Sequence, residues 1–256
     1  MTTISGFTFI HNGIAGGYPF VEAINAIRPY VDNIYVVDMQ STDGTREVLE
    51  QLDVNIIDGY WGNQAGETLK QAHAMHIYCD GDIIWHMEAD EVYDDSLCKA
   101  IEHRIKHGYS DSLKVYRLQV EQNFQRIRWY PEPVHRVFPN HSGIVKEGHS
   151  TNQHNISDIL ATNRTILGVE HGYLWDCTNC FRDNWFNRVN QQAELRNSKP
   201  QYLMAGVHML NKVEFTEEEV KRFLAWPHWT WGHTPLDIPD ILKPLVGMTK
   251  YEPSKS

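Results

Sequence analysis

The sequence predicts an α/β protein with a mostly parallel, doubly wound sheet flanked by helices. Short apolar runs alternate with helical patterns through residues 1–108 in the order β-α-β-α-β-α-β-α, which implies right-handed crossovers. Residues 31–38 are almost continuously apolar, as in a strand covered on both faces. Carboxylates directly follow the fourth apolar run, and ligands of such sheets bind beyond the carboxyl ends of the strands.

The first half of the chain supplies four expected strands and four expected helices. The strands are expected at residues 4–10, 31–38, 54–57 and in the run that begins at 82. A glycine-rich turn follows the first strand, and Pro19 suits the first turn of the helix after it. The helices are expected at residues 19–28, around 45–52, at 66–79 and at 95–106.

The pattern changes after residue 108. Residues 113–120 and 134–138 predict two further strands, with at least one antiparallel pair. From about residue 170 the chain is typical of loops and helices rich in tryptophan, with helices expected at 184–197, 216–225 and 237–245 and a frayed end at 251–256. The sequence therefore predicts three parts: the two halves of one domain at 1–108 and 109–183, and a helical, aromatic-rich C-terminal extension at 184–256.

Composition and charge exclude several classes of protein. The net charge of -10 argues against a general nucleic-acid binder, which would present a basic face. No apolar run approaches the roughly 20 residues needed to cross a bilayer, and the first residues carry no basic-then-apolar leader. The sequence therefore predicts a cytoplasmic protein without a membrane span, and it leaves the oligomeric state open.

The four cysteines do not predict a disulfide framework. Cys79 and Cys98 fall in helical patterns and are expected to be small core residues. Cys177 and Cys180 form a single C-x-x-C, which favours a structural role over zinc because no second pair accompanies it. A disulfide is not expected in a cytosolic protein.

A cluster of acids closes the fourth strand. Glu88 and Asp90 directly follow the apolar run 83–85, so both are expected to be partly buried at the rim of the sheet. Like charges so close are costly unless a cation compensates them, and oxygen ligands suit Mg²⁺ or Mn²⁺, which in turn suits a diphosphate. Alternatively, the acids of this stretch only charge the start of the next helix, which explains Asp94 and Asp95 better than the first two.

Two strings in the first half carry a family resemblance. Residues 36–45 read V-V-D-M-Q-S-T-D-G-T, and residues 87–91 read M-E-A-D-E. With the strand end F-I-H-N at residues 9–12, they resemble the GT-A glycosyltransferases of family 2, whose usual strings are V-V-D-x-x-S-T-D-G-T and L-D-A-D-E. The resemblance implies a GT-A, Rossmann-like mixed sheet with a nucleotide-sugar-binding half at 1–108.

The second half resembles the cell-surface-glycan branch of that family. Residues 133–138 (P-V-H-R-V-F) and 143–147 (G-I-V-K-E) are similar to its R-L-F…G-x-V-H-E segment, and residues 171–173 (H-G-Y) to its later H-Y. The resemblance implies that residues 109–183 form the acceptor side of the domain.

The resemblance implies that a UDP-sugar donor binds to residues of the first half. Asp38 is expected to accept a hydrogen bond from the uracil or ribose, the alternative being a turn cap for Ser41 and Asp43. Met39 stands where the family often has a second acid. The donor-binding residues implied by the resemblance are Phe9, His11, Asp38, Met39, Gln64, Glu88 and Ala89.

The resemblance also implies a divalent ion, Mn²⁺ or Mg²⁺, held by Asp90. Glu88 takes the place of the first acid of the D-x-D motif, and its longer side chain is expected to reach the ribose, or the metal through water. His171 is the first candidate for a further ligand, before His149 and His135, and an imidazole ligand would favour Mn²⁺.

The implied reaction is transfer of a sugar, with inversion at the anomeric carbon, from a UDP-sugar (UDP-glucose by default) to a saccharide or glycan acceptor. The acceptor attacks in line, and a carboxylate must take its proton. Glu147 is the first choice for this base, followed by Glu91 and Asp176. Three arginines are candidates for contacts to the diphosphate or an acidic acceptor, or for surface ion pairs: Arg126, Arg128 and Arg136.

Two other functions remain open at this point. A nucleotidyltransferase would carry a glycine-rich loop with basic residues after the first strand, and residues 12–17 have the glycines without the charge. A non-catalytic module that binds a sugar nucleotide would share the fold and show no turnover. The aromatic segment 226–233 suits packing onto the sheet or a partner, or a platform for an acceptor sugar.

Overall fold

The computed structural model of the chain describes residues 2–62, 71–72, 74–108, 112–121, 126–127, 132–140, 164–184, 187, 191 and 238–253. Several expectations fall outside this described part of the chain. They concern Gln64, Glu147, His149, Arg128, most of the helix at 184–197, the helix at 216–225 and the aromatic segment 226–233.

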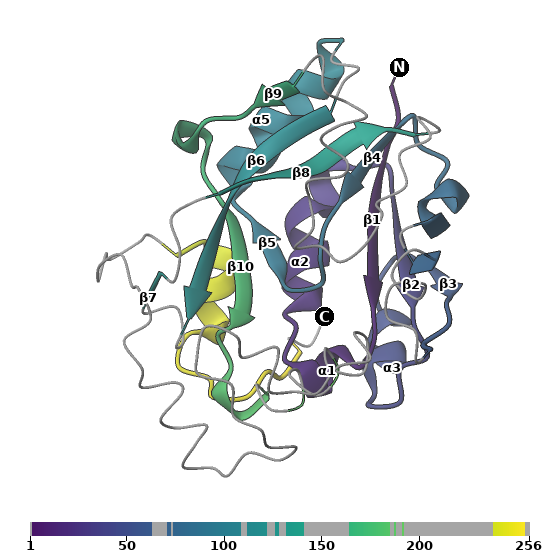
Figure 1. Cartoon of the computed structure of the whole chain (residues 1–256), viewed down its shortest axis with the longest axis vertical. Coiled ribbons are helices and arrows are strands. Elements are labelled where there is room, and N and C mark those ends of the chain that lie inside the picture. Colours follow the sequence, from purple (N-terminus) through teal and green to yellow (C-terminus); the bar gives the residue numbers. More distant parts are fainter. Residues whose placement is uncertain are drawn as a thin grey trace.

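Four parallel strands form the first half of the sheet (Figure 1). They are β1 (Ile4–Ile10), β2 (Asn33–Asp38), β3 (Asn55–Asp58) and β4 (Ile83–His86), and their spatial order is β3-β2-β1-β4. Each lies where an apolar run predicted it, so the expected parallel half is confirmed. The order of the strands reverses between β1 and β4, and ligands of open α/β sheets bind beyond the carboxyl ends at such a switch point.

Helices connect these strands. Those described in this half are α1 (Gly13–Gly16), α2 (Phe20–Ile27), η1 (Arg28–Tyr30), α3 (Thr45–Leu49), η2 (Met75–Tyr78) and α5 (Asp95–Lys106). The helix α5 has the bounds that the sequence predicted. Where a helix was expected at 66–79, the described residues include helical positions 71, 72 and 74 and then the 3-10 turn η2.

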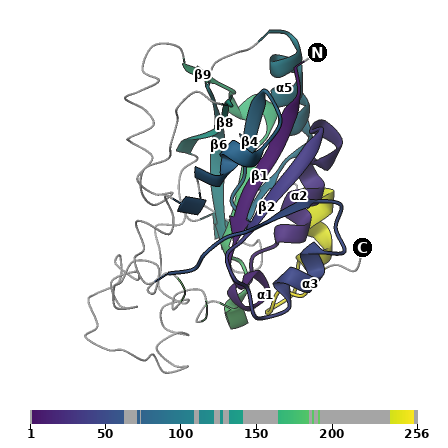
Figure 2. The ribbon, with the colours of Figure 1, turned by 90° about the vertical axis from the view of Figure 1, so that its right-hand side faces the viewer.

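Apolar side chains on the two faces of the sheet form two buried clusters. The larger one joins alternate residues of β1 and β4 to α2 and α5, and it includes Ile10, Ile24, Trp85 and Ile101. The smaller one covers the opposite face with Phe7, Val37, Met39, Ala72, Cys79 and Ile84. Figure 2 shows α2 and α3 on one side of β1 and β2. Because side chains alternate along a strand, polar residues that follow β1, β2 and β4 also divide between these two faces.

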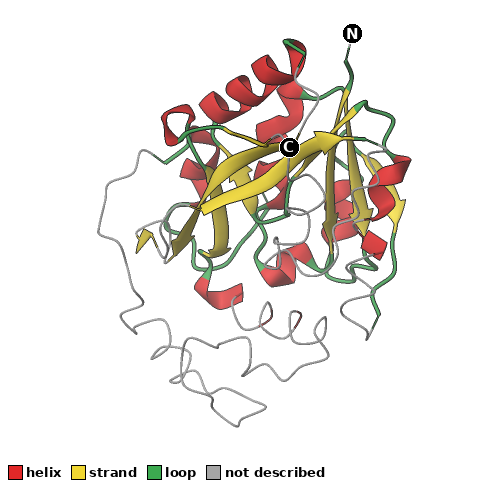
Figure 3. Ribbon diagram, turned by 45° about the horizontal axis from the view of Figure 1, so that its top comes forward, coloured by secondary structure: helices red, strands yellow, loops and turns green. Residues whose placement is uncertain are grey.

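The second half continues the same sheet with mixed pairing. β8 (Glu132–Pro139) pairs antiparallel with β4 and with β6 (Ser112–Glu121), β10 (Leu174–Asn179) pairs parallel with β6, and β5 (Glu91–Tyr93) pairs antiparallel with β10. Two short strands, β7 (Arg126–Ile127) and β9 (Arg164–Ile166), pair with β6. Figure 3 shows these strands as one curved sheet with helices around it. The expected mixed, mostly parallel α/β fold is confirmed.

The three-residue strand β5 was not predicted. Its residues directly follow the acidic turn, where the sequence indicated only the approach to a helix. The residues of each pair in its ladder are more than eighty positions apart in the chain: Leu174 with Tyr93, Trp175 with Val92 and Asp176 with Glu91. A strand this short is stabilised by its distant partner rather than by its own sequence pattern.

A β-bulge interrupts the pairing of β6 with β8. Leu113 lies opposite Val137, whereas Lys114 lies opposite His135, so Arg136 is an extra residue in β8. Val134 and Val137 both enter the larger core cluster, although plain alternation would place them on opposite faces. A bulge bends its strand and re-aims the side chain that it adds.

Helical turns close the described part of the chain. η3 (Val169–His171) precedes β10, η4 (Arg182–Asn184) follows it, and η6 (Asp240–Leu245) stands where a helix was expected at 237–245. The expectation of a frayed end is wrong at Tyr251, which has no exposed surface and donates its hydroxyl to Glu22 of α2 at 2.9 Å. No helix among the described residues is long and apolar enough to cross a membrane.

Candidate active site

The acids after β4 form a tight turn that is closed in both directions. The backbone N–H of Glu91 donates to the carbonyl of Glu88 at 2.9 Å, which leaves Ala89 and Asp90 at the two central positions. The backbone N–H of Glu88 donates in return to Oε2 of Glu91 at 3.2 Å. The turn begins beside β1, since Met87 still donates to the Phe7 carbonyl at 3.0 Å. We call residues 88–91 the acidic turn.

The side chain of Arg136 joins the two ends of the acidic turn. Its Nε and Nη2 donate to Oε2 and Oε1 of Glu91 at 2.6 and 2.5 Å, and Nη2 also donates to Oε1 of Glu88 at 2.9 Å. The side chains of Arg136 and Glu91 have no exposed surface, whereas that of Glu88 keeps 17%. A paired guanidinium fork of this kind fixes geometry as well as charge.

A second arginine extends this buried network. Nη1 of Arg117 on β6 lies 3.7 Å from Oε1 of Glu91 and 3.6 Å from Oδ2 of Asp176 on β10. Asp176 and Glu91 are direct partners in the ladder of β10 with β5, and such like-charged pairs repel unless a cation lies between them. Arg117 therefore compensates a cross-strand pair of acids that the fold itself creates.

The charges of this network shift each other's pKa values. Burial opposes the charge of Arg136, but Glu91 and Glu88 outweigh it, and the pKa of Arg136 is raised. Burial raises the pKa of Glu91, and Arg136 counteracts that shift. The bidentate contact favours the ionised pair, since it offers each Glu91 oxygen a guanidinium donor.

This network corrects several sequence-based expectations. Glu88 and Asp90 were expected to need a metal cation to compensate their charges, whereas the carboxylate of Glu88 is paired with Arg136. Arg136 was a candidate for the diphosphate or for a surface ion pair, and it is instead fully buried beneath the turn. Glu91 was the second choice for the general base, and a paired carboxylate without exposed surface does not fit that role. Asp176, the third choice, is buried beside Arg117.

Asp90 lies at the tip of the acidic turn and is half-buried. Its backbone carbonyl accepts a hydrogen bond from the N–H of Cys177 at 2.9 Å, which ties the turn to β10. Within the described ranges, no group of three or more His, Cys, Asp or Glu side chains is placed to hold a metal ion. Any ion at Asp90 would need donors from elsewhere, such as a bound phosphate.

The structure does not bring His171 to Asp90. Along β10, Cys177 lies beside Asp90 and Leu174 beside Tyr93, so the strand runs away from the turn in the direction of His171. His171 lies in η3, which packs against α5, and a side chain at neighbouring Gly172 would meet Asp94. The other described candidate, His135, is buried against the Ser112 hydroxyl.

A second arginine-linked pair of acids fixes the ends of β2 and β3. Oδ1 of Asp38 accepts the backbone N–H of Ser41 at 3.1 Å, which is the turn-cap arrangement that the sequence left open as an alternative. Nη1 of Arg46 donates to Asp38 at 3.4 Å and to Asp58, its partner in the β2–β3 ladder, at 2.6 Å. The side chain of Asp38 is only 7% exposed in this arrangement. Asp43 has a separate role, since it accepts hydrogen bonds from the Thr45 hydroxyl and backbone N–H.

An aromatic pair lies beyond the end of β1. The rings of His11 and Trp61 are stacked with centroids 3.8 Å apart and planes 11° from parallel. Nδ1 of His11 lies 2.6 Å from the Met39 carbonyl, and Nε2 lies 3.0 Å from the Asn12 amide nitrogen. These contacts identify the neutral tautomer with the proton on Nδ1, because only a donor can face the carbonyl. Phe9 lies on the same face, with its ring 6.4 Å from that of His86.

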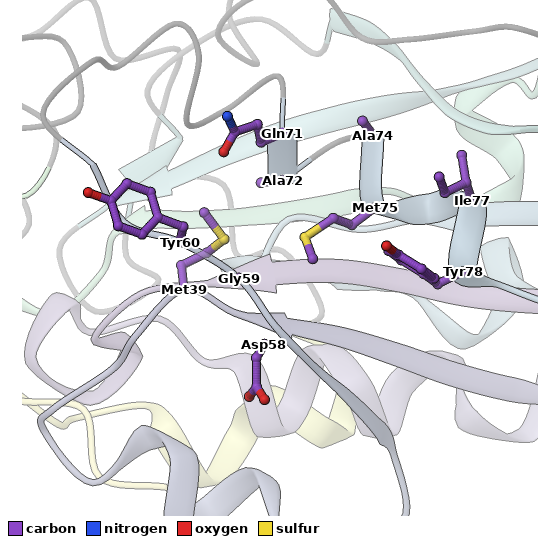
Figure 4. A pocket seen from close by; sticks show the side chains of 10 residues that line it. All are labelled: Met39, Asp58, Gly59, Tyr60, Gln71, Ala72, Ala74, Met75, Ile77 and Tyr78. Atoms are coloured by element: carbon purple, nitrogen blue, oxygen red, sulfur yellow. The ribbon is translucent and has the colours of Figure 1, made fainter.

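A cavity of about 420 Å³ opens beside this pair (Figure 4). Met39, Tyr60 and Met75 contribute to its walls, and in Figure 4 the sulfur atoms of the two methionines point toward each other. Gly59 leaves room for Met39, since a Cβ at this position would lie 2.4 Å from its sulfur. The size is that of a small-molecule site, and the apolar walls suit a flat ring such as a nucleobase.

The mixed α/β sheet with an acidic turn after β4 defines the class of fold, and a comparison with protein families identifies the family. The model of glycosyl transferase family 2 matches residues 18–168, more than half of the chain, and the chain belongs to that family. Glycosyl transfer is the reaction for which this family is named.

Two curated relatives are named as glycosyltransferases. A protein of Rickettsia felis named as an uncharacterized glycosyltransferase is 29% identical over 133 residues, which are 51% of this chain and 44% of the relative. A similarly named protein of Rickettsia conorii is 26% identical over 112 residues, 43% of this chain and 38% of the relative. The chain thus matches less than half the length of these relatives.

The likeness to solved structures concerns the fold. S. aureus TarS residues 1–349 superpose with a TM-score of 0.52 at 13% identity, over 87% of this chain and 69% of that one. The longer S. aureus TarS structure gives 0.52 at 12% identity, over 95% and 47%.

The sequence did not identify several residues that the structure places at the site. Trp61 and Tyr60 follow β3 without any motif, and Arg117 lies within an ordinary strand pattern. One signal was available: a charged residue between apolar neighbours in a central strand, as in V-H-R-V at 134–137, must find a buried partner.

Proposed function

We propose that this glycosyltransferase moves a sugar from a UDP-sugar to a saccharide or glycan acceptor, with Mn²⁺ or Mg²⁺ and with inversion at the anomeric carbon. The observation that carries the proposal is the acidic turn at the switch point of the sheet, which presents Asp90 on the same rim as the aromatic pair His11 and Trp61. A diphosphate held at the turn with its base at the aromatic pair would span this rim.

The base and ribose of the donor are assigned to the rim formed by β1, β2 and β4. In this proposal His11 and Phe9 face the base, and Met39, which is buried and lines the cavity, gives the base site an apolar wall. Asp38 would contact the nucleotide only through the part of its carboxylate that the turn cap and Arg46 leave accessible. Glu88 and Ala89 would contact the ribose or diphosphate, and Gln64 stays a prediction outside the described residues.

A divalent ion fits Asp90 as a bridge to substrate phosphates rather than as a closed protein site. Mg²⁺ and similar ions are commonly held by one or two carboxylates, with phosphate oxygens and water completing the shell. Asp90 is half-buried at the tip of the acidic turn, whereas Glu88 and Glu91, at its two ends, each contact Arg136. When bound, the ion would neutralise charge on the leaving diphosphate.

The acceptor proton requires a base that reaches solvent. Glu147 keeps this assignment as a prediction, since it lies outside the described residues. UDP-glucose is the default donor, and the cytoplasmic location expected from the sequence also stays a prediction. S. aureus TarS, which shares the fold at a TM-score of 0.51, has been solved in complex with UDP, and this supports UDP as the first nucleotide to test.

The test combines binding with turnover. UDP and UDP-sugars with Mn²⁺ should raise the melting temperature of the protein, because a ligand that binds only the folded form stabilises it. UDP-sugar hydrolysis should fall by about a hundredfold or more in Asp90→Ala, if the ion stabilises the leaving group as proposed. The matched control is Asp82→Ala, which removes an exposed acid from the opposite end of β4.

Each alternative has its own outcome. Release of pyrophosphate from a nucleoside triphosphate and a sugar phosphate would indicate a nucleotidyltransferase. Binding without turnover in any form would indicate a non-catalytic module. If no nucleotide raises the melting temperature, the UDP-sugar assignment is wrong.

A further inference from the structure

We propose that Arg136 is a positioning residue for the transfer reaction: it fixes the acidic turn so that Glu88 and Asp90 are held ready for the donor diphosphate. The inference rests on the proposed function, because it concerns how the same site is held in its working geometry. It assigns to Arg136 no contact with the substrate.

The guanidinium of Arg136 is fixed on every side. Nη1 donates to the carbonyl of His135 at 2.9 Å, within its own strand. Nε and Nη2 donate to Glu91, and Nη2 reaches Glu88 as well. One planar group thus connects β8 to the first and last residues of the acidic turn. Lysine cannot reproduce this, since an ammonium is a point charge without the planar fork.

The bulge in β8 gives the strand one additional residue, Arg136, relative to β6. Val134 and Val137 fill the core on either side, and the added position, Arg136, is directed at the turn. A regular β8 would place position 136 in simple alternation with its neighbours. Bulges often re-aim a side chain next to an active site.

Stability alone does not explain a buried arginine at this place. Replacing a buried ion pair by apolar residues of similar volume is often neutral or stabilising, so such pairs are weak evidence for a stabilising role. Here the ion pair of Arg136 with Glu91 holds a turn in which two other acids reach the surface. The side chain of Glu88 is 17% exposed, and Asp90 is half-buried. The buried side of the network therefore orders groups that face outward.

The consequence for the reaction is preorganisation. Carboxylates that already have their final orientation need little rearrangement when a charged donor arrives, and fixed charges of this kind are most effective where water is excluded. The positive charge of Arg136 also offsets the negative charges of Glu88 and Glu91. This lowers the repulsion that these acids would exert on a diphosphate. Arg136 thus acts through the turn on both binding and turnover.

The experiment is a double-mutant cycle between Arg136 and Glu88. UDP affinity with Mn²⁺ is measured by calorimetry, and kcat and KM for UDP-sugar hydrolysis are measured alongside, for the wild type, Arg136→Lys, Glu88→Gln and the double variant. We expect Arg136→Lys to weaken UDP binding by about tenfold and to lower kcat, in the range seen when residues supporting a ligand shell are replaced. In the Glu88→Gln background the same change should cost less than about threefold, because the charged contact between the two residues is already replaced by a neutral one.

A second pair of variants covers the case in which Arg136→Lys does not fold. Arg136→Gln combined with Glu91→Gln removes both buried charges together, so no unpaired charge remains in the core. This protein should unfold at a urea concentration near that of the wild type and still bind UDP more weakly. Tyr251→Phe, which loses a buried hydrogen bond far along the chain from the turn, is the control for destabilisation without loss of binding.

The outcomes separate this inference from the proposed function. If the wild type neither binds UDP nor hydrolyses a UDP-sugar, the proposed function is wrong, and the inference falls with it. If the wild type is active and folded Arg136 variants bind and turn over equally well, only the inference is overturned. An equal loss in both Glu88 backgrounds would also overturn it, since that pattern indicates a general structural role.

Discussion

The side chain of Glu91 accepts the backbone N–H of Glu88, while the backbone N–H of Glu91 donates to the Glu88 carbonyl. The two residues therefore close a turn through the backbone and through a carboxylate at once. Arg136 adds a charged contact to both. This arrangement makes the acid that follows the D-x-D-like motif a structural member of the site, and its effects on stability can be measured.

Glu91→Gln should destabilise the protein strongly. The amide keeps the shape of the side chain but leaves the buried charge of Arg136 without its principal partner, and breaking a buried ion pair from one side costs about 3–5 kcal/mol. Urea unfolding followed by circular dichroism measures the difference. Glu102→Gln is the control, because its i,i+4 pair with Lys106 lies at the surface and such pairs contribute about 0.5 kcal/mol or less. Equal losses in the two variants would contradict the buried network.

Tyr251→Phe should destabilise the protein by about 1–3 kcal/mol, because it removes the hydrogen bond that the hydroxyl donates to buried Glu22. Burial and the nearby Glu22 raise the pKa of Tyr251 well above its ordinary value of 10.0. The folded state therefore favours the protonated phenol, and this contribution to stability is full below pH 10 and is lost as the pH rises further.

The difference in unfolding free energy between wild type and Tyr251→Phe consequently changes with pH. It should be constant from pH 7 to 9 and should shrink above pH 10 by up to about 1.4 kcal/mol per pH unit. Chemical denaturation at several pH values measures it. A difference that stays constant beyond pH 10 would show that the phenol is not shielded as the structure indicates.

Gly59→Ala should strain the cavity beside β3. The new Cβ would lie 2.4 Å from the sulfur of Met39 and 2.7 Å from Cγ1 of Val37, and overpacking of this kind costs about 1–3 kcal/mol. Thermal unfolding measures the loss. Adding Met39→Ala should restore part of it, whereas the contact with Val37 remains. If UDP also binds more weakly to the single variant, the cavity belongs to the nucleotide site.

The four thiols should react slowly in the native protein. Cys79, Cys98, Cys177 and Cys180 are all buried and none forms a disulfide. Burial raises the pKa of the Cys79 thiol to about 12, and burial likewise raises the pKa values of Cys98 and Cys177, so little of the reactive thiolate is present at neutral pH. A colorimetric thiol reagent should label less than one cysteine per chain within minutes and all four after denaturation. Labelling that becomes fast only after a chelator would instead indicate a metal at Cys177 and Cys180.

The parallel half of the fold and the family could both be predicted from local signals in the sequence. Runs such as Ile4–Ile10 and the pattern of α5 are local signals, because apolar periodicity and turn residues act over a few neighbouring positions. The strings at 36–45 and 87–91 located the rim of the sheet for the same reason. The identity of the acids at that rim could be taken directly from the chain.

The contacts of those acids depend on the three-dimensional arrangement of the strands. The pairing of Glu91 with Arg136, the opposition of Asp176 and Glu91, and the separation of His171 from Asp90 all depend on which distant strands become neighbours. Because of the bulge at Arg136, Val134 and Val137 both lie in the larger core cluster, whereas simple alternation would place them on opposite faces of the sheet. Strand register and bulges are set by packing between segments far apart in the chain, and a local sequence pattern does not specify them.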